Sequence, residues 1–336
     1  MKLDEKDCLL GDRLLEKGSK LVLAGQPGVN KSRLVLQLAA ASCSGKEWLG
    51  FPTFACDMIW LIMQTENSVR RLQMDLRILV KQYGRGFLKQ VVIHTLENDM
   101  DGLVGLQGNY DRLARTMQRF NPDIFVVDPL RDFGIGDLNT DRDMSLTCLT
   151  MGQLVRQGNP QRALIVVQHA LTGRAGAIKA VGYERIGFAR SNKVLAGWTR
   201  AQINIAPGAP DNNDTLVIGC GKNSNGREFM PFAVQRNGAG IFESFPDFNL
   251  EAWMREVSTK SRSGSPYKHY SLAEAHGALP DFESWEYGHL VQEIMDKLRC
   301  GRTRATELVR EGLAHGAWHQ ARRSKRYTKG ASLGLD

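Results

Sequence analysis

A short apolar run, a glycine-containing loop and a helical segment follow one another near the N-terminus, and this succession constrains the fold more than any other feature. Residues 21–24 are apolar enough for a buried strand, and residues 31–42 carry helical periodicity. The loop between them reads Gly25-Gln26-Pro27-Gly28-Val29-Asn30-Lys31-Ser32. It matches the pattern GxxxxGK(S/T) at each defined position except Asn30, which replaces the second glycine. The succession indicates an α/β domain.

This kind of loop binds phosphate groups, because its backbone N–H groups point inward and the following helix adds the positive end of its dipole. We expect ATP to be the ligand, with Lys31 neutralising its β- and γ-phosphates and the Ser32 hydroxyl ligating Mg²⁺. The nucleotide-binding residues are then Gly25, Gln26, Pro27, Gly28, Val29, Asn30, Lys31, Ser32 and Arg33. The alternative is an ordinary glycine-bearing turn between a strand and a helix.

Asn30 is the departure from the pattern. Asparagine is the non-glycine residue that best tolerates a positive φ, so we expect the loop to keep its shape. The side chain nevertheless brings extra atoms close to the phosphates. The substitution therefore weakens the case for hydrolysis more than the case for nucleotide binding.

Three polar residues follow other buried runs, at strand ends where ligands bind in open α/β sheets. Asp128 follows the apolar residues 124–127 and is predicted to hold the Mg²⁺ shell. Glu66, after the run 58–63, either polarises the attacking water as a general base or caps the next helix. His169 comes after another such run, and either senses the γ-phosphate or is an ordinary loop histidine.

Short apolar runs alternate with helical stretches over the first two thirds of the chain. The runs lie at 21–24, 58–63, 91–93, 123–128 and 163–167, and the helical stretches at 31–42, 68–83 and 110–120. This alternation predicts a largely parallel sheet whose strands are buried on both faces. From Arg200 onwards, turns separate candidate strands at 201–205, 216–219, 232–235 and 240–243, which we expect to extend the sheet antiparallel.

In their order and spacing these motifs resemble the RecA-like ATPases of the plasmid RepA type. The resemblance covers about residues 8–245 and rests on the phosphate loop, Glu66, Asp-Pro-Leu-Arg-Asp-Phe at 128–133, and Gln168-His169. Members of that family are hexameric replicative DNA helicases. The resemblance therefore implies a RecA-like P-loop NTPase core, ATP hydrolysis and a homo-oligomer in the form of a hexameric ring.

Two further segments match later motifs of that family. Ala-Arg-Ser-Asn-Lys-Val-Leu at 189–195 is similar to the segment with the arginine finger, which implies that Arg190 reaches the γ-phosphate of a neighbouring subunit. Gly-Lys-Asn-Ser-Asn-Gly at 221–226 resembles a segment whose basic residue also approaches the neighbour's nucleotide, which points to Lys222. For both residues the alternative is an exposed basic position in a loop.

The positive charge of the chain is concentrated near its C-terminus. Residues 297–329 contain ten basic residues and two acidic ones, so this segment alone equals the net charge of +8. Such a local excess indicates a surface for a polyanion, although a basic segment can also serve solubility alone. The stretch at 258–266, rich in Ser, Lys, Arg and Gly, is the best linker candidate ahead of it.

The order of elements in the basic segment resembles a winged helix-turn-helix domain. An apolar stripe over 290–298 predicts one helix, and we expect Thr303 to be the N-cap of a second. Short strands at 317–321 and 326–328 would form the wing. The residues predicted to bind DNA are Arg302, Arg304, Arg310, Arg322, Arg323, Lys325 and Arg326, with the first three facing outward from the second helix. The alternative is a helical hairpin for subunit contacts.

These observations predict a RecA-like ATPase domain at 1–255, a linker at 256–267 and a DNA-binding winged helix at 268–330. The expected function is an ATP-dependent DNA motor, either a hexameric helicase or a DNA-remodelling ATPase. The alternative is a nucleotide-gated DNA-binding regulator or loader that binds ATP and oligomerises with little hydrolysis. The apolar runs stop short of membrane-spanning length and the six cysteines form no CxxC pair, so we expect no membrane partner and a cytoplasmic location.

Overall fold

The computed structural model describes residues 5–95, 106, 108–189, 193–210, 212–258, 270–281, 283–298, 300–321 and 326–330. The chain divides into two compact units, Met1–Ser258 and Thr259–Asp336. The first unit contains two hydrophobic cores and the second contains one.

A large mixed sheet forms the centre of the first unit. Among the described residues its nine strands run in the order β11-β10-β9-β8-β3-β7-β6-β4-β5. Neighbours from β8 to β5 pair in parallel, and β9, β10 and β11 continue the sheet antiparallel, which confirms the expected mostly parallel α/β sheet. The strands are β3 (Lys20–Gly25), β4 (Trp60–Gln64), β5 (Val91–His94), β6 (Ile124–Asp128), β7 (Ala163–His169), β8 (Ala201–Ala209), β9 (Asn212–Asn223), β10 (Phe232–Arg236) and β11 (Phe242–Ser244).

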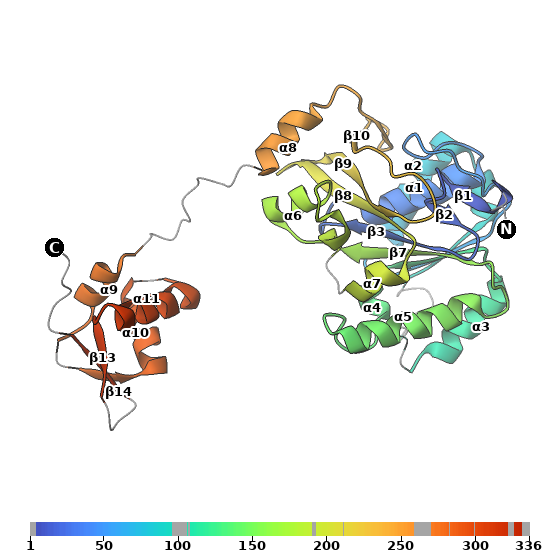
Figure 1. The fold of residues 1–336 in the computed structure, drawn as a ribbon. Coiled ribbons are helices and arrows are strands. Elements are labelled where there is room, and N and C mark those ends of the chain that lie inside the picture. The colour runs from blue at the N-terminus through green and yellow to red at the C-terminus, as the bar shows by residue number, and fades with distance from the viewer. Residues whose placement is uncertain are drawn as a thin grey trace. The chain divides into compact units, whose positions relative to one another are not determined.

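Helices cover both faces of this sheet, with α1 and α2 on one face and α3, α4 and α5 on the other (Figure 1). A separate antiparallel hairpin of β1 (Cys8–Leu10) and β2 (Leu15–Glu16) precedes the sheet. The helices are α1 (Lys31–Cys43), α2 (Val69–Tyr83), α3 (Tyr110–Phe120), α4 (Leu130–Phe133), α5 (Asp141–Arg156), α6 (Gly173–Lys179), α7 (Lys193–Trp198) and α8 (Leu250–Ser258), with short 3₁₀ turns at Glu5–Asp7, Gly86–Lys89 and Arg185–Phe188.

Alternate side chains of the same strands belong to the two different cores of the first unit. In β3, Leu21 and Leu23 join the core that contains α1 and α2, while Val22 and Ala24 join the core that contains α3 and α5. Successive side chains of a strand point to opposite faces, so a strand covered by helices on both sides must be apolar throughout. This is why the parallel strands appear in the sequence as continuous apolar runs.

The β8–β9 hairpin is longer than the sequence indicates. Strand β8 continues to Ala209 and β9 begins at Asn212, so both extend into the stretch 207–213 that the sequence pattern indicates as a turn. Pro207 pairs with Leu216. Strand β3 ends its pairing with β8 at Ile205, so beyond that point β9 is the strand with which β8 pairs among the described residues. Proline is tolerated in a strand with one free edge, because on that side no neighbouring strand needs the N–H that proline lacks. The hairpin therefore projects beyond the parallel sheet.

In its described residues the second unit combines three helices with a small antiparallel sheet. Within the part of this unit that the structure describes, the three strands lie in the order β12-β14-β13. A core of apolar residues from all three helices, including Leu290 and Leu308, packs against Trp318 of β13. The elements are α9 (Leu272–Ala278), β12 (Ser284–Glu286), α10 (Tyr287–Leu298), α11 (Arg302–Ala314), β13 (Trp318–Gln320) and β14 (Arg326–Lys329).

Two expectations for α11 differ from the structure. The N-cap is Gly301 rather than Thr303, so the helix begins two residues earlier than a threonine cap would place it. Arg304 faces outward only in part: its side chain is 31% exposed, its guanidinium donates to the carbonyl oxygen of Tyr270 at 2.8 Å, and it pairs with Glu307 at 3.2 Å. Its long stem and fork-shaped head let it reach a backbone carbonyl ahead of α9.

Among the residues that the structure describes, no helix combines the length and apolar character needed to cross a membrane.

Candidate nucleotide-binding site

The loop between β3 and α1 adopts the backbone conformation that the sequence pattern requires. Gly28 has φ of 82° and Asn30 has φ of 58° with ψ of 27°, so Asn30 takes the left-handed conformation in place of the pattern's second glycine. Gly25 is needed for space, because a Cβ there would lie 2.8 Å from Val29 and 3.1 Å from the carbonyl oxygen of Ile205. The loop is thus a tight turn opening a thirteen-residue helix.

Lys31 lies at the first position of α1 and is 7% exposed. Its ammonium group donates to the carbonyl oxygen of Gln26 across the loop, at 2.9 Å. Burial lowers the pKa of Lys31, while the nearby carboxylates of Asp128 and Glu66 oppose that shift. A buried ammonium group inside a phosphate loop, close to two acids, is suited to binding an anionic ligand together with a cation.

Asp128 ends β6 and is 3% exposed. Burial raises the pKa of its carboxyl group to about 6, against a hydrogen bond from Ser32 and the charge of Lys31, which both lower it. The Ser32 hydroxyl and a single carboxylate are oxygen donors of the kind that hold Mg²⁺ together with substrate phosphates. Among the described residues no cluster of three or more His, Cys, Asp or Glu side chains could hold a metal ion.

Glu66 and His169 contact each other across the ends of β4 and β7. The Nε2 atom of His169 lies 3.3 Å from Oε1 of Glu66. Burial and the charge of Lys31 lower the pKa of His169, and Glu66 opposes that shift. The alternative role of Glu66 as a helix cap does not hold, because Ser68 is the N-cap of α2 and its hydroxyl accepts from the N–H of Arg71.

Two cavities meet at this pair. A cavity of about 270 Å³ is lined by most of the loop, by Glu66 and His169, and by Arg71 and Asp75 of α2. Arg33 also lines it, and its guanidinium is paired with Asp75 at 2.5 Å. A larger cavity of about 590 Å³ shares Pro27, Glu66 and His169 with the first and extends towards residues 136–139. Glu66 and His169 therefore line both the cavity at the phosphate loop and the larger cavity beside it.

Arg131 was not singled out from the sequence but belongs to this region. It is the second residue of α4, its side chain is 67% exposed, and it lines the larger cavity with Glu66 and His169. The neighbouring Asp132 pairs with Arg131 and accepts a hydrogen bond from Thr65, the residue before Glu66. Arg131 lies within the Asp-Pro-Leu-Arg-Asp-Phe motif at 128–133, in which the sequence pattern indicates a function for Asp128 alone.

Lys222 lies outside the two cavities at the loop. Its ammonium group donates to the carbonyl oxygens of Ala196 and Thr199 at the end of α7, at 2.7 and 2.8 Å, and burial lowers its pKa. It lines a separate cavity of about 460 Å³ with Gln202 and Lys193. Positive charge at a helix C-terminus is stabilising. In this structure Lys222 therefore stabilises the C-terminus of α7 of the same chain.

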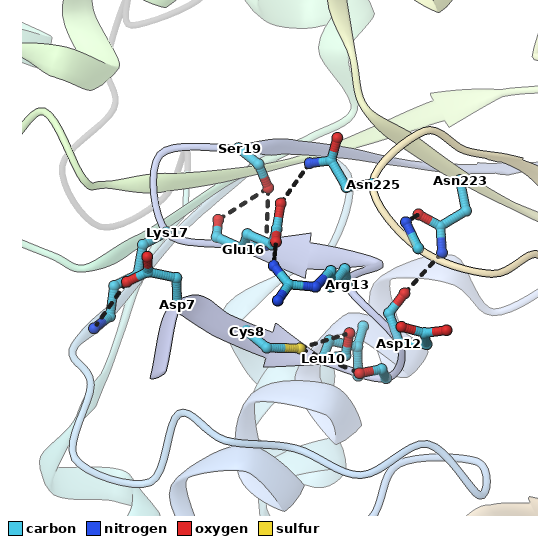
Figure 2. A network of polar contacts seen from close by, with 12 residues as sticks. Asp7, Cys8, Leu10, Asp12, Arg13, Glu16, Lys17, Ser19, Asn223 and Asn225 are labelled. Atoms are coloured by element: carbon cyan, nitrogen blue, oxygen red, sulfur yellow. Dashed lines mark hydrogen bonds and ion pairs between the residues drawn. The ribbon is translucent and has the colours of Figure 1, made fainter. Parts of the chain in front are cut away.

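The turn after Lys222 is fastened to the N-terminal hairpin (Figure 2). The side-chain amide of Asn223 donates to the carbonyl oxygen of Asp12 at 2.8 Å, and that of Asn225 donates to Glu16. Glu16 also pairs with Arg13 at 2.5 Å. This network holds the backbone that carries Lys222 in place. It could not be predicted, because the bonded partners lie more than 200 positions apart in the chain.

Arg190 lies outside the described residues. The segment just before it is held by two buried side-chain amides of β8 that sequence reasoning also missed. Asn204 donates to the carbonyl oxygens of Ala180 and Arg185, and Gln202 donates to those of Arg185 and Ile186. Polar side chains buried in an otherwise apolar strand mark such anchoring contacts.

The predicted DNA-binding residues that the structure describes in the second unit differ in their contacts. Arg302 and Arg310 of α11 and Arg326 of β14 are exposed, and Arg326 donates to the Ser284 hydroxyl at 3.3 Å. Arg304 is engaged with its own unit, as described above. Three further predicted DNA-binding residues, Arg322, Arg323 and Lys325, lie outside the described residues.

A family model described as AAA domain matches residues 3–174 of the chain. That match covers half of the chain and contains the phosphate loop, Glu66, Asp128 and His169. The chain therefore belongs to the AAA domain family, and the match includes the phosphate loop typical of P-loop ATPases.

Two solved structures are similar to the chain at low sequence identity. The RadB recombinase is 12% identical, with a TM-score of 0.44 over 68% of this chain and 91% of that chain. The KaiC-like protein PH0186 from the archaeon Pyrococcus horikoshii OT3 is 14% identical, with a TM-score of 0.46 over 72% of this chain and 98% of that chain. No curated protein sequence matches the chain.

Proposed function

We propose that this protein is an ATP-hydrolysing DNA motor of the RepA-type helicase kind. The observation that carries the proposal is the meeting of Lys31, Asp128 and the Glu66–His169 pair around one loop. Asp128 and His169 end β6 and β7, Glu66 follows β4, and Lys31 opens α1 after the loop that follows β3. These four strands are adjacent in the sheet. Charged groups that shift one another's pKa at a cavity are characteristic of reacting sites.

The roles follow from the chemistry of each group. Loop N–H groups and Lys31 would hold the β- and γ-phosphates, and Ser32 and Asp128 would hold Mg²⁺, which supplies charge neutralisation when bound. Glu66 would take a proton from the attacking water as general base. His169, which is neutral when its pKa is lowered, can donate to the Glu66 carboxylate from Nε2 and so keep it aimed at the water.

Arg190 and Lys222 are proposed to act on the nucleotide of a neighbouring subunit in a hexameric ring. Support for Lys222 comes from its firmly held turn, because a charge that acts across an interface must be presented by rigid backbone. Its bonds to the end of α7 would have to be exchanged for phosphate when the subunits meet. A guanidinium or ammonium supplied in this way stabilises charge in the transition state.

DNA binding is proposed for the second unit, as a winged helix within residues 268–330. The expected boundary between an ATPase domain at 1–255 and a linker at 256–267 falls three residues too early, because α8 continues to Ser258. Support for the winged helix comes from the order of its elements: α10 and α11 are followed by the antiparallel pair β13 and β14, with β12 completing the small sheet. Helix α11 would enter the major groove with Arg302 and Arg310, while Arg326 and the three basic residues before it would contact phosphates.

A second candidate function is a nucleotide-gated DNA-binding regulator that binds ATP with little turnover. The observation that favours it is Asn30, whose side-chain amide is bonded to the carbonyl oxygen of Asn213 in the same chain. A phosphate loop that is bonded at this position to a hairpin of the same chain is suited to retaining a nucleotide as well as to hydrolysing it rapidly.

Mg·ATP binding and single-turnover hydrolysis by the full chain decide between these two functions. We expect the motor to bind Mg·ATP and to convert it in a single turnover, and Lys31→Ala to abolish both. Tight binding with no conversion would make the protein a regulator. Absence of binding would reject both proposals.

A further inference from the structure

The tip of the β8–β9 hairpin lies against the phosphate loop. The side-chain amide of Asn30 donates to the backbone carbonyl oxygen of Asn213, which is 3.1 Å away and 183 positions along the chain. A Cβ built on Gly28 would come within 3.5 Å of the side-chain amide of Asn213. The hairpin therefore contacts the loop at the very residue where this chain departs from the phosphate-loop pattern.

The hairpin is fastened at two further points. Asp214, next to the tip, forms an ion pair with Arg236 of β10. Further down, the indole N–H of Trp253 in α8 donates to the carbonyl oxygen of Pro207 at 3.1 Å. Residues 207–210, Trp253 and Gln26 of the loop also line a cavity of about 420 Å³. Strand β9 pairs with β10 as far as Thr215, so the part of the hairpin beyond that residue is held by these contacts and lies beside the cavity.

We infer that Asn30 is a positioning residue that fastens the phosphate loop to this hairpin, and that the hairpin transmits the state of the loop to α8. The inference rests on the proposed nucleotide site and adds to it a route to the last helix of the first unit. Asparagine meets both demands, because it adopts the φ of 58° that the loop requires and supplies a side-chain donor that glycine lacks.

The physical basis is that phosphate binding draws on the loop's own N–H groups. Any adjustment of the loop moves Asn30 and changes its contact with Asn213. The hairpin then has two arrangements, and bound nucleotide changes their relative populations. Because Trp253 of α8 is bonded to the hairpin, the position of α8 changes with them. Residues 259–269 follow α8 directly, so the route ends where the chain leaves the first unit.

Amide hydrogen exchange of the full chain, with and without Mg·ATP as the probe, tests this inference. In the wild-type protein we expect nucleotide to change the exchange of residues 212–216 and of α8 together. Asn30→Gly keeps the backbone conformation without strain but removes the donor. Its hairpin amides should exchange about two- to tenfold faster without nucleotide, the change expected for one lost hydrogen bond, and nucleotide should no longer affect α8.

Two more variants separate the ends of the route. Trp253→Phe retains the aromatic packing but removes the N–H donor to Pro207, so the nucleotide effect should persist at residues 212–216 and disappear at α8. Asn213→Ala is the matched control for Asn30→Gly. Because the acceptor is a backbone carbonyl, this variant should behave as the wild type does.

The inference is overturned if Asn30→Gly shows wild-type exchange at both segments, with and without nucleotide. It is also overturned if Asn213→Ala has the same effect as Asn30→Gly, since the side chain of Asn213 would then be responsible. A wild-type protein that fails to bind Mg·ATP rejects the nucleotide site instead. In that event the nucleotide-free comparison of Asn30→Gly with the wild type still decides whether Asn30 fastens the hairpin.

Discussion

Charged residues gather in two regions of this protein, and the two regions differ in burial. At the phosphate loop, Lys31 and Asp128 are 7% and 3% exposed, and their pKa values are shifted in opposite directions by burial. On the second unit, Arg302 and Arg310 are exposed. Buried charges depend strongly on one another, whereas exposed charges are screened by water and salt. Substitutions should therefore have large effects in the first region and small, salt-dependent effects in the second.

The largest effect is expected for Glu66→Gln, because an amide cannot accept a proton from water. We expect kcat for ATP hydrolysis to fall about 10²- to 10⁴-fold, the usual contribution of a general base, while Mg·ATP binding is retained. Steady-state hydrolysis and equilibrium binding, measured on the same preparation, provide the test. A variant with full ATPase activity would remove Glu66 from the proposed mechanism.

A smaller and salt-dependent effect is expected when Arg302 and Arg310 are both replaced by alanine. Each lost phosphate contact should reduce the slope of log K against log salt concentration by about 0.9. DNA affinity measured over a series of salt concentrations should therefore show a slope shallower by about two. An unchanged slope would mean that α11 does not face DNA.

Arg304 and Arg302 lie two positions apart on α11 and should behave differently. Arg304→Ala loses the hydrogen bond to Tyr270 and should lower the free energy of unfolding of the second unit by about 1 kcal/mol. Arg302→Ala, on the exposed side, should change it by less than about 0.5 kcal/mol. Denaturant unfolding of the full chain, followed at the second unit, compares the two variants. Equal effects would contradict the assignment of Arg304 as an internal contact.

The smallest effect is a pH dependence of stability that comes from His169. Burial and the charge of Lys31 lower its folded-state pKa below the ordinary value of 6.5. As pH falls through 6.5, the unfolded chain therefore takes up a proton that the folded protein does not, and stability declines. The wild type should lose stability relative to His169→Gln in that interval, and the difference should level off below the lowered pKa. A difference that does not vary with pH would contradict this.

Much of the nucleotide site could be predicted because it is encoded locally. Asp128, Glu66 and His169 each follow an apolar run, and parallel strands bring their carboxyl ends to one edge of a sheet. The loop residues are contiguous, and the preference of asparagine for positive φ correctly indicated the conformation of Asn30. The mostly parallel sheet followed from the same runs.

The contacts that could not be predicted are all long-range. The bond from Asn30 to Asn213 and the bond from Arg304 to Tyr270 join positions 183 and 34 apart. Lys222 bonds to carbonyl oxygens rather than facing solvent, and its motif alone does not indicate which carbonyls lie nearby. The β8–β9 hairpin is longer than expected because Pro207, taken by itself, predicts a turn. Proline fits into β8 at this position only because β8 no longer pairs with β3 there, and the sequence does not reveal where that pairing ends.

The rate of ATP hydrolysis by the full chain, with and without single- and double-stranded DNA, tests the central claim most directly. A motor whose ATP site serves a DNA-binding unit should hydrolyse ATP faster when DNA is present, and the Glu66→Gln variant should remove both the basal and the stimulated rate. Hydrolysis that is unaffected by either form of DNA, at low salt where the basic surface binds most strongly, would contradict the account.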